Sequence, residues 1–186
     1  MNVRKTQRQF LLGSTAVLLG ALAIAGCKPS HPDEKPVVTS SLSTNNLSAV
    51  SVSQDREKGV MTLSGTVDTQ DLKNQAESLA KQAAPDYTIA DQIGVRPPGD
   101  NQAGSAASNR DSAIEDNFKA EIKEHKALND QSIHASAKNG TLVLTGSVKT
   151  LAQKKEAGKL AKGVPHVEQV VNELEVKPGK HSTANS

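Results

Sequence analysis

The strongest constraint on the fold is an internal repeat, in which residues 59–97 align without gaps on residues 140–178 at a constant offset of 81. Twelve of these 39 aligned positions carry the same residue. Apolar and small hydroxyl residues stay in register elsewhere, and the pair Leu47 and Leu128 extends the offset upstream. A match of this length indicates one structural unit used twice. The 186 residues therefore hold two small domains rather than one larger domain.

The second copy shows the order of secondary structure within the unit. A capping-box pattern and apolar residues at three- and four-residue spacing predict a helix over residues 112–128. Asn139-Gly140, between two alternating apolar segments, predicts a β-hairpin with a primed turn. Another capping box at Thr150 opens a second helix, and alternation over residues 170–176 predicts a third strand. The sequence thus predicts an α+β fold, with two αββαβ domains in tandem and helices on one face of each sheet.

The opening helix of the first copy departs from this pattern. Under the same offset, Ile114 and Ile122 of the second copy correspond to Asp33 and Ser41, so the apolar stripe of the first helix is eroded. We expect the first domain to lack this helix or to keep only a short one around residues 37–46. Its sheet is then under-covered, and we expect this domain to rest on the second domain or to be the less stable one.

Composition sets the expected boundaries between the segments. The stretch 98–111 is dominated by Gly, Ala, Ser and Asn, which bury little apolar surface, and it predicts a flexible linker. We expect a signal peptide at 1–26, a lipidated tether at 27–46, a first domain at 47–97, the linker at 98–111, a second domain at 112–178 and a disordered tail at 179–186.

The amino terminus has the pattern of an exported protein. The first nine residues include three basic residues and no acid, and an uncharged run of 15 residues follows over residues 10–24. Small residues then lead to Cys27, the only cysteine. This is typical of a signal peptide with a lipobox, at which bacterial lipoproteins are diacylated and cleaved. A retained transmembrane helix is the alternative, but it needs about 20 apolar residues. We predict lipidation of Cys27.

Cleavage before Cys27 also changes the charge balance. It removes three of the 22 basic residues and no acid, which leaves 19 basic against 20 acidic residues. This balance gives no support for nucleic-acid binding. Lys28 follows the cysteine, where some Gram-negative lipoproteins carry an aspartate that retains them at the inner membrane. The outer membrane is therefore favoured if the source has one.

The two copies share a short motif, Gly-x-x-x-Leu-x-Gly-x-Val, which stands at residues 59–67 and again at residues 140–148. With the alanines and leucines of the following helix, it resembles the BON domain, named after bacterial osmotically inducible and nodulation proteins. The resemblance covers about residues 47–97 and 112–178. It implies a periplasmic, non-catalytic αββαβ module that is associated with envelope integrity and osmotic stress and contacts phospholipid surfaces.

No pattern in the chain points to catalysis, a metal or a cofactor. The histidines have no second ligand at metal-binding spacing, and they stand at His31, His125, His134, His166 and His181. The repeated glycines do not form a phosphate-binding loop; Gly140 fits a tight turn, and Gly146 fits a strand that a helix approaches closely. We therefore predict a chain that is not an enzyme.

Lysines crowd the second helix of the second copy, where Glu156 is the only acid among them. They are a solvated helix face or a contact for anionic phospholipid headgroups. The candidate lipid-binding residues are Lys149, Lys154, Lys155, Lys159 and Lys162. The matching segment of the first copy is mixed in charge, so we expect lipid contact from the second domain alone.

The sequence leaves two functions open. The first is an envelope lipoprotein whose two modules support envelope integrity or osmotic-stress tolerance by contacting anionic phospholipid. The alternative is a membrane-tethered periplasmic adaptor that binds an envelope protein partner and has no lipid contact beyond its anchor.

Overall fold

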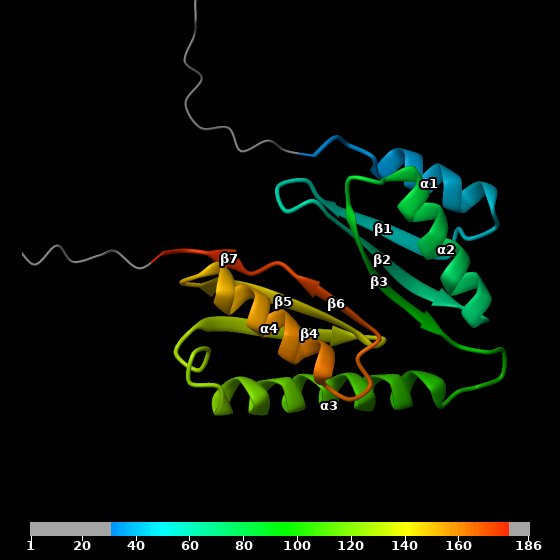
Figure 1. Ribbon diagram of the computed structural model, residues 1–186. Helices are drawn as coiled ribbons and strands as arrows, with labels where there is room; N and C mark the ends of the chain where they lie inside the picture. The colour runs from blue at the N-terminus through cyan, green and yellow to red at the C-terminus, as the bar shows by residue number, and fades with distance from the viewer. Residues whose placement is uncertain (1–30, 179–186) are drawn as a thin grey trace, which may run out of the picture.

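The computed structural model describes residues 31–178, which form two similar α/β units lying side by side (Figure 1). Domain 1 contains α1 (Lys35–Thr44), β1 (Val50–Asp55), β2 (Val60–Val67), α2 (Gln70–Ala83) and β3 (Thr88–Val95). Domain 2 contains α3 (Ala103–Glu124), β4 (Ser132–Lys138), β5 (Thr141–Val148), α4 (Leu151–Gly163), β6 (Gln169–Asn172) and β7 (Glu175–Val176). The predicted signal peptide, Cys27 and the tail after residue 178 lie outside the described residues.

Both domains have the predicted αββαβ topology. In domain 1, β2 is the central strand and pairs antiparallel with β1 and parallel with β3. In domain 2, β5 pairs in the same way with β4 and β6, and it also pairs with β7. The central strands β2 and β5 are related by the offset of 81, so the sequence repeat is a structural repeat.

The helices of each domain cover one face of its sheet. In domain 1, Leu42 of α1 and Ala80 of α2 pack in one core with Leu63 of β2 and Ile93 of β3. In domain 2, the corresponding core contains residues of α3, α4, β4 and β5, with Phe118 as its largest side chain. Because Leu, Ile, Val and Ala dominate both cores, close contact between small helix residues and the sheet replaces aromatic packing.

Local sequence signals account for the turn and the helix start in domain 2. Asn139 and Gly140 join β4 to β5 with φ angles of 50° and 82°, as a primed two-residue turn requires. Thr150 and Gln153 form the predicted capping box at the start of α4. Gly146 has a φ of 108°, and a side chain there would meet the backbone of Ser132 at the start of β4. The expected close approach therefore comes from a strand rather than from a helix.

The opening helix of domain 1 is short, as expected, but it covers its sheet. Val38 and Leu42 of α1 are 0% and 1% exposed and belong to the core of domain 1. The expectation of an under-covered sheet is therefore wrong. The ungapped offset compared the wrong residues, because the pair Val38 and Leu42 matches Ile114 and Phe118 at an offset of 76. With the strands aligned at the offset of 81, domain 2 has five more residues than domain 1 between this buried pair and the first strand.

The predicted flexible linker is mostly helix, because α3 begins at Ala103 and runs through residues 103–111 into the predicted helix. The boundary at 98–111 is wrong for these nine residues. Asp100 Oδ1 accepts hydrogen bonds from the backbone N–H groups of Gln102 and Ala103, each at 2.9 Å, and so caps the helix start. The alanines that follow have the highest helix propensity of any residue. Ser112 is therefore inside the helix and is not its cap.

The predicted tether also ends earlier than expected, because the chain contacts domain 1 from His31 onward. Arg56 Nε donates to the carbonyl of His31 at 2.8 Å, and the N–H of His31 donates to the carbonyl of Arg56 at 2.9 Å. The Tyr87 hydroxyl and Gln54 Nε2 donate to the carbonyl of Pro32 at 2.6 and 3.0 Å. With α1 starting at Lys35, the prediction of a tether is wrong for residues 31–46.

The third strand of domain 2 is interrupted, whereas β3 of domain 1 is continuous. The predicted strand over residues 170–176 is divided into β6 and β7. Asn172 Oδ1 accepts the N–H of Leu174 at 3.2 Å between them, but Asp91 makes the same bond to Ile93 within the unbroken β3, so this bond alone does not explain the interruption. Leu174 lies in the core of domain 2.

Among residues 31–178, no helix combines the length and the apolar character that crossing a membrane requires.

Candidate functional site: the lysine face of α4 and the domain junction

Three of the five candidate lysines border one open groove between α4 and β6, which we call the α4 groove. Its lining residues are Lys155, Gly158, Lys159, Lys162, Val170 and Asn172, and its volume is about 340 Å³. The three lysines are exposed and follow one another at i, i+4 and i+7, so they share one face of the helix. Among the described residues, none of the three forms an ion pair or a side-chain hydrogen bond.

The other two candidate lysines lie elsewhere. Lys149 precedes α4, and its ammonium lies 2.8 Å from the Asp130 carboxylate, which lowers the pKa of Asp130. Lys154 lines a different cavity of about 550 Å³ between the two domains, together with Lys58 and Glu173. The structure therefore separates the predicted cluster into a group of three lysines and two single lysines.

The repeat places an equivalent groove in domain 1, where α2 and β3 correspond to α4 and β6. The offset of 81 pairs Lys155, Gly158 and Asn172 with Asn74, Glu77 and Asp91. These domain 1 residues line a cavity of about 170 Å³ that domain 2 closes with Thr141, Glu168 and Gln169. The groove of domain 1 is thus an intramolecular docking site, whereas its counterpart on domain 2 is open.

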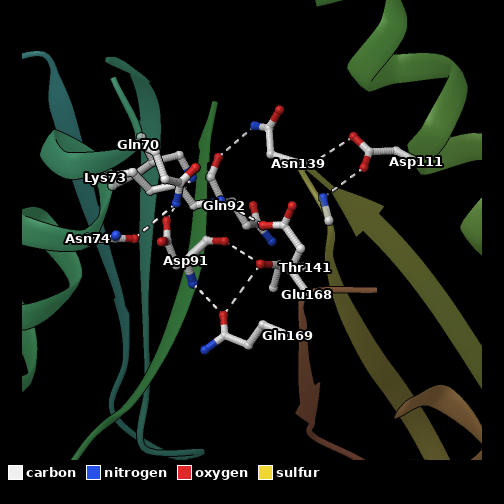
Figure 2. Close-up of polar contacts among 12 residues, drawn as sticks. Gln70, Lys73, Asn74, Asp91, Gln92, Asp111, Asn139, Thr141, Glu168 and Gln169 are labelled. Atoms are coloured by element: carbon white, nitrogen blue, oxygen red, sulfur yellow. Dashed lines mark hydrogen bonds and ion pairs between the residues drawn. The ribbon is translucent and has the colours of Figure 1, made fainter. Parts of the chain in front are cut away.

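Domain 2 docks onto domain 1 by pairing the outer edge of β3 with side chains, as Figure 2 shows. Gln169 makes two of these bonds: its Oε1 accepts the N–H of Asp91 at 2.8 Å, and its Nε2 donates to the carbonyl of Ile89 at 2.7 Å. Asn139 Nδ2 donates to the carbonyl of Gln92 at 2.8 Å, and Thr141 Oγ1 donates to the carbonyl of Asp91. An edge strand that would otherwise expose unpaired backbone groups is therefore satisfied.

Two ion pairs also join the domains at the junction. Lys73 is only 7% exposed, and its ammonium lies 3.3 Å from the Glu168 carboxylate of domain 2. Beside this pair, burial raises the pKa of the Asp91 carboxyl above its ordinary value. Lys58 pairs with Glu173 at 2.7 Å, and this hydrogen bond raises the pKa of Lys58.

Apolar residues of the two sheets also meet at the junction. Val60 and Ala90 of domain 1 pack against Val143 and Val171 of domain 2. These residues alternate with core residues along their strands, so they belong to the faces that carry no helix. The sequence did not predict the junction residues. One difference between the copies could have indicated them: Gly140 repeats Gly59, but copy one has no identical residue for Thr141, Glu168 or Gln169.

Domain 1 lacks the groups that would let this docking continue to another copy. The offset pairs Asn139, Thr141 and Glu168 with Lys58, Val60 and Tyr87. Tyr87 is hydrogen-bonded within domain 1, and Lys58 carries the same charge as the lysines of the α4 groove. We therefore do not expect domain 1 of a second molecule to bind the α4 groove in the way that domain 2 binds domain 1 within one molecule.

Among the described residues, His31 is the only histidine whose side chain has a hydrogen-bond partner, because its Nδ1 lies 3.0 Å from the carbonyl of Arg56. His181 lies outside the described residues. Within residues 31–178, no group of three or more His, Cys, Asp or Glu side chains could hold a metal ion. The α4 groove and the junction are therefore the candidate functional sites within the described residues.

Comparison with known proteins follows the same division into two units. The model of the BON domain family matches residues 37–97 and 110–178, together more than half of the chain. Osmotically-inducible protein Y of Escherichia coli (strain K12) is 26% identical over 133 residues, which cover 72% of this chain. The chain spans 65% of the length of that relative.

Two solved structures of CdsD, a structural protein of the type III secretion system of Chlamydia trachomatis, are 13% identical to this chain, with TM-scores of 0.30 and 0.29. The matches cover 78% and 77% of this chain and 62% and 65% of those chains. The two family matches and the αββαβ topology of both domains show that this chain is a tandem member of the BON domain family.

Proposed function

We propose that the protein is a non-catalytic lipoprotein of the bacterial envelope, which supports envelope integrity or osmotic-stress tolerance by contacting anionic phospholipid through domain 2. Its BON family membership and its similarity to an osmotically inducible protein support a stress-related envelope role. The α4 groove supports the contact with phospholipid. The observation that carries this proposal is a row of three unpaired lysines bordering an open groove.

The chemistry of the α4 groove suits a headgroup that carries negative charge. Gly158 lets the Asn172 side chain approach the helix closely, since an added Cβ would be 2.8 Å from Asn172 Nδ2. Val170 of β6 gives the groove an apolar wall. A lysine near an anionic membrane surface contributes about 1 kcal/mol, so three on one face contribute about 3 kcal/mol at low salt. The equivalent groove of domain 1 has acidic residues and is closed by domain 2, so the contact is confined to domain 2.

We predict that the triple substitution Lys155→Gln, Lys159→Gln and Lys162→Gln weakens binding to anionic vesicles about 100-fold, as expected from a loss of about 3 kcal/mol. The measurement is sedimentation of the unlipidated chain, residues 28–186, with phosphatidylglycerol vesicles at low salt. Vesicles of phosphatidylcholine alone should bind neither protein.

The matched control is Lys119→Gln, Lys123→Gln and Lys126→Gln, which removes the same charge from exposed positions on and just after α3. This control should bind within a few fold of the unsubstituted chain. Equal weakening by both triple variants would show that net charge alone determines binding. Binding that is insensitive to salt would also contradict the proposal.

An adaptor function is the second candidate, and the closed groove of domain 1 favours it. There a protein segment of domain 2 places the Glu168 carboxylate against Lys73, whose equivalent in domain 2 is Lys154. Lys154 faces the cavity between the domains, so a partner with an acidic surface loop would meet Lys155, Lys159 and Lys162 in the α4 groove instead. Absence of vesicle binding, together with a crosslink from Lys159 to one envelope protein in intact cells, would replace the lipid proposal with this one.

Lipidation has a direct test of its own. We predict that the mature protein starts at Cys27 and carries the added mass of a diacylglyceryl group, because the residues before it match a lipobox. Mass spectrometry of the amino-terminal peptide after expression in a Gram-negative host is the measurement. A full-length chain that keeps residues 1–26, or an unmodified Cys27, would contradict the lipid anchor.

A further inference from the structure

The junction borders a second cavity of about 360 Å³, which we call the linker cavity because the chain passes from domain 1 to domain 2 beside it. Domain 1 contributes Lys73 of α2 and residues 93–97 at the end of β3 and beyond. Domain 2 contributes Asn139, Glu168 and the first two turns of α3. The cavity therefore exists only when the domains are docked, and it lies apart from the α4 groove, with which it shares no lining residue.

Two arginines line the linker cavity without a partner. Within residues 31–178, the side chains of Arg96 and Arg110 form no ion pair and no hydrogen bond. Lys73 also lines the cavity, but the Glu168 carboxylate balances its charge. Asp100 is the remaining acid, and its Oδ1 already accepts two N–H groups at the start of α3. The walls thus carry an excess of positive charge.

The position of Arg96 makes this excess larger. Its guanidinium lies against Gly104 in the first turn of α3, where an added Cβ would be 3.1 Å from the Arg96 Cζ atom. The amino-terminal end of a helix carries a partial positive charge, which adds to the charge of Arg96 beside the single carboxylate of Asp100. Ala103, Ala106 and Ala107 line the same helix face and leave room beside Arg110 for such an anion.

We propose that the linker cavity is a binding site for a compact phosphate group, either as a soluble phosphate ester or as a phospholipid headgroup. Guanidinium groups present paired N–H donors that match the oxygens of phosphate, and two of them from different elements can bind one phosphate from two sides. Because Arg96 directly follows β3 and Arg110 lies within α3, a bound phosphate would join the end of domain 1 to the start of domain 2.

The test is isothermal titration of the unlipidated chain, residues 28–186, with inorganic phosphate and with glycerol 3-phosphate. We expect binding in the millimolar range or tighter for the unsubstituted chain. Arg96→Gln and Arg110→Gln should each weaken it at least about tenfold, because each removes a charge-assisted hydrogen bond. Lys119→Gln, an exposed cation further along α3, should bind as the unsubstituted chain does.

A second arm distinguishes the two sources of phosphate and keeps this site separate from the α4 groove. If Arg96→Gln and Arg110→Gln bind phosphatidylglycerol vesicles normally, the phosphate is soluble; if they lose vesicle binding while the α4 lysines are intact, it is a headgroup. The triple lysine variant should keep its affinity for inorganic phosphate. No phosphate binding by the unsubstituted chain, or equal weakening by Lys119→Gln, would overturn the proposal.

Discussion

Replacing Leu42 with alanine should lower the free energy of unfolding of domain 1 by about 2–5 kcal/mol, the range found for truncating a buried leucine. The Leu42 side chain is 1% exposed and packs in the core of domain 1, so its removal leaves a cavity under α1. Urea unfolding followed by tyrosine fluorescence is the measurement. Tyr87 is the only tyrosine, there is no tryptophan, and Tyr87 lies in domain 1.

The matched control is Val37→Ala on the same helix, because the Val37 side chain is 55% exposed. It should change the free energy of unfolding by less than about 0.5 kcal/mol. If Leu42→Ala were as mild as Val37→Ala, α1 would be a peripheral helix, and the under-covered sheet expected from the sequence would be the better description.

Replacing Gln169 with leucine should uncouple the two domains. The substitution keeps a similar side-chain volume but removes both hydrogen bonds to the edge of β3, at Asp91 and Ile89. Each buried backbone group left without a partner costs about 1–3 kcal/mol, so we expect docking to weaken by about 2–6 kcal/mol. Urea unfolding followed by both tyrosine fluorescence and far-ultraviolet circular dichroism should then show two separated transitions.

In the unsubstituted chain the two probes should report one coincident transition, because the junction couples the domains. Gln82→Leu is the control, since Gln82 is exposed on α2 and its side chain bonds only to Ser78 on the same helix. Coincident transitions in Gln169→Leu, at the same midpoint as the control, would show that apolar contact alone holds the domains together.

The sequence predicted those parts of the fold that depend on local signals. Asn139-Gly140 and the capping box at Thr150 each fix a turn or a helix start with a few neighbouring residues, and both are confirmed. The opening helices were harder to place, because five additional residues in domain 2 shift the alignment outside the ungapped repeat. The early start of α3 depends on the hydrogen bonds that Asp100 accepts, whereas the composition around Asp100 is typical of a loop.

The candidate site could be predicted only in part. The sequence indicated a crowd of five lysines at the second helix of copy two, and the structure places three of them, Lys155, Lys159 and Lys162, on one face of α4. The sequence could not show that Lys154 turns toward the junction, because that depends on where domain 1 lies. Likewise, Gln169 looks like an ordinary polar strand residue until the edge of β3 is placed opposite it. Contacts between domains leave no periodic pattern in a sequence.

The fastening of His31 and Pro32 to Arg56, Gln54 and Tyr87 limits how far the protein can extend from a bilayer. If Cys27 carries lipid, His31 follows only four residues after the lipid anchor, and a fully extended chain covers at most about 14 Å over that stretch. Domain 1 would then stay within a few water layers of the headgroups. Such a molecule would diffuse laterally close to the membrane surface and could not contact structures far from the bilayer.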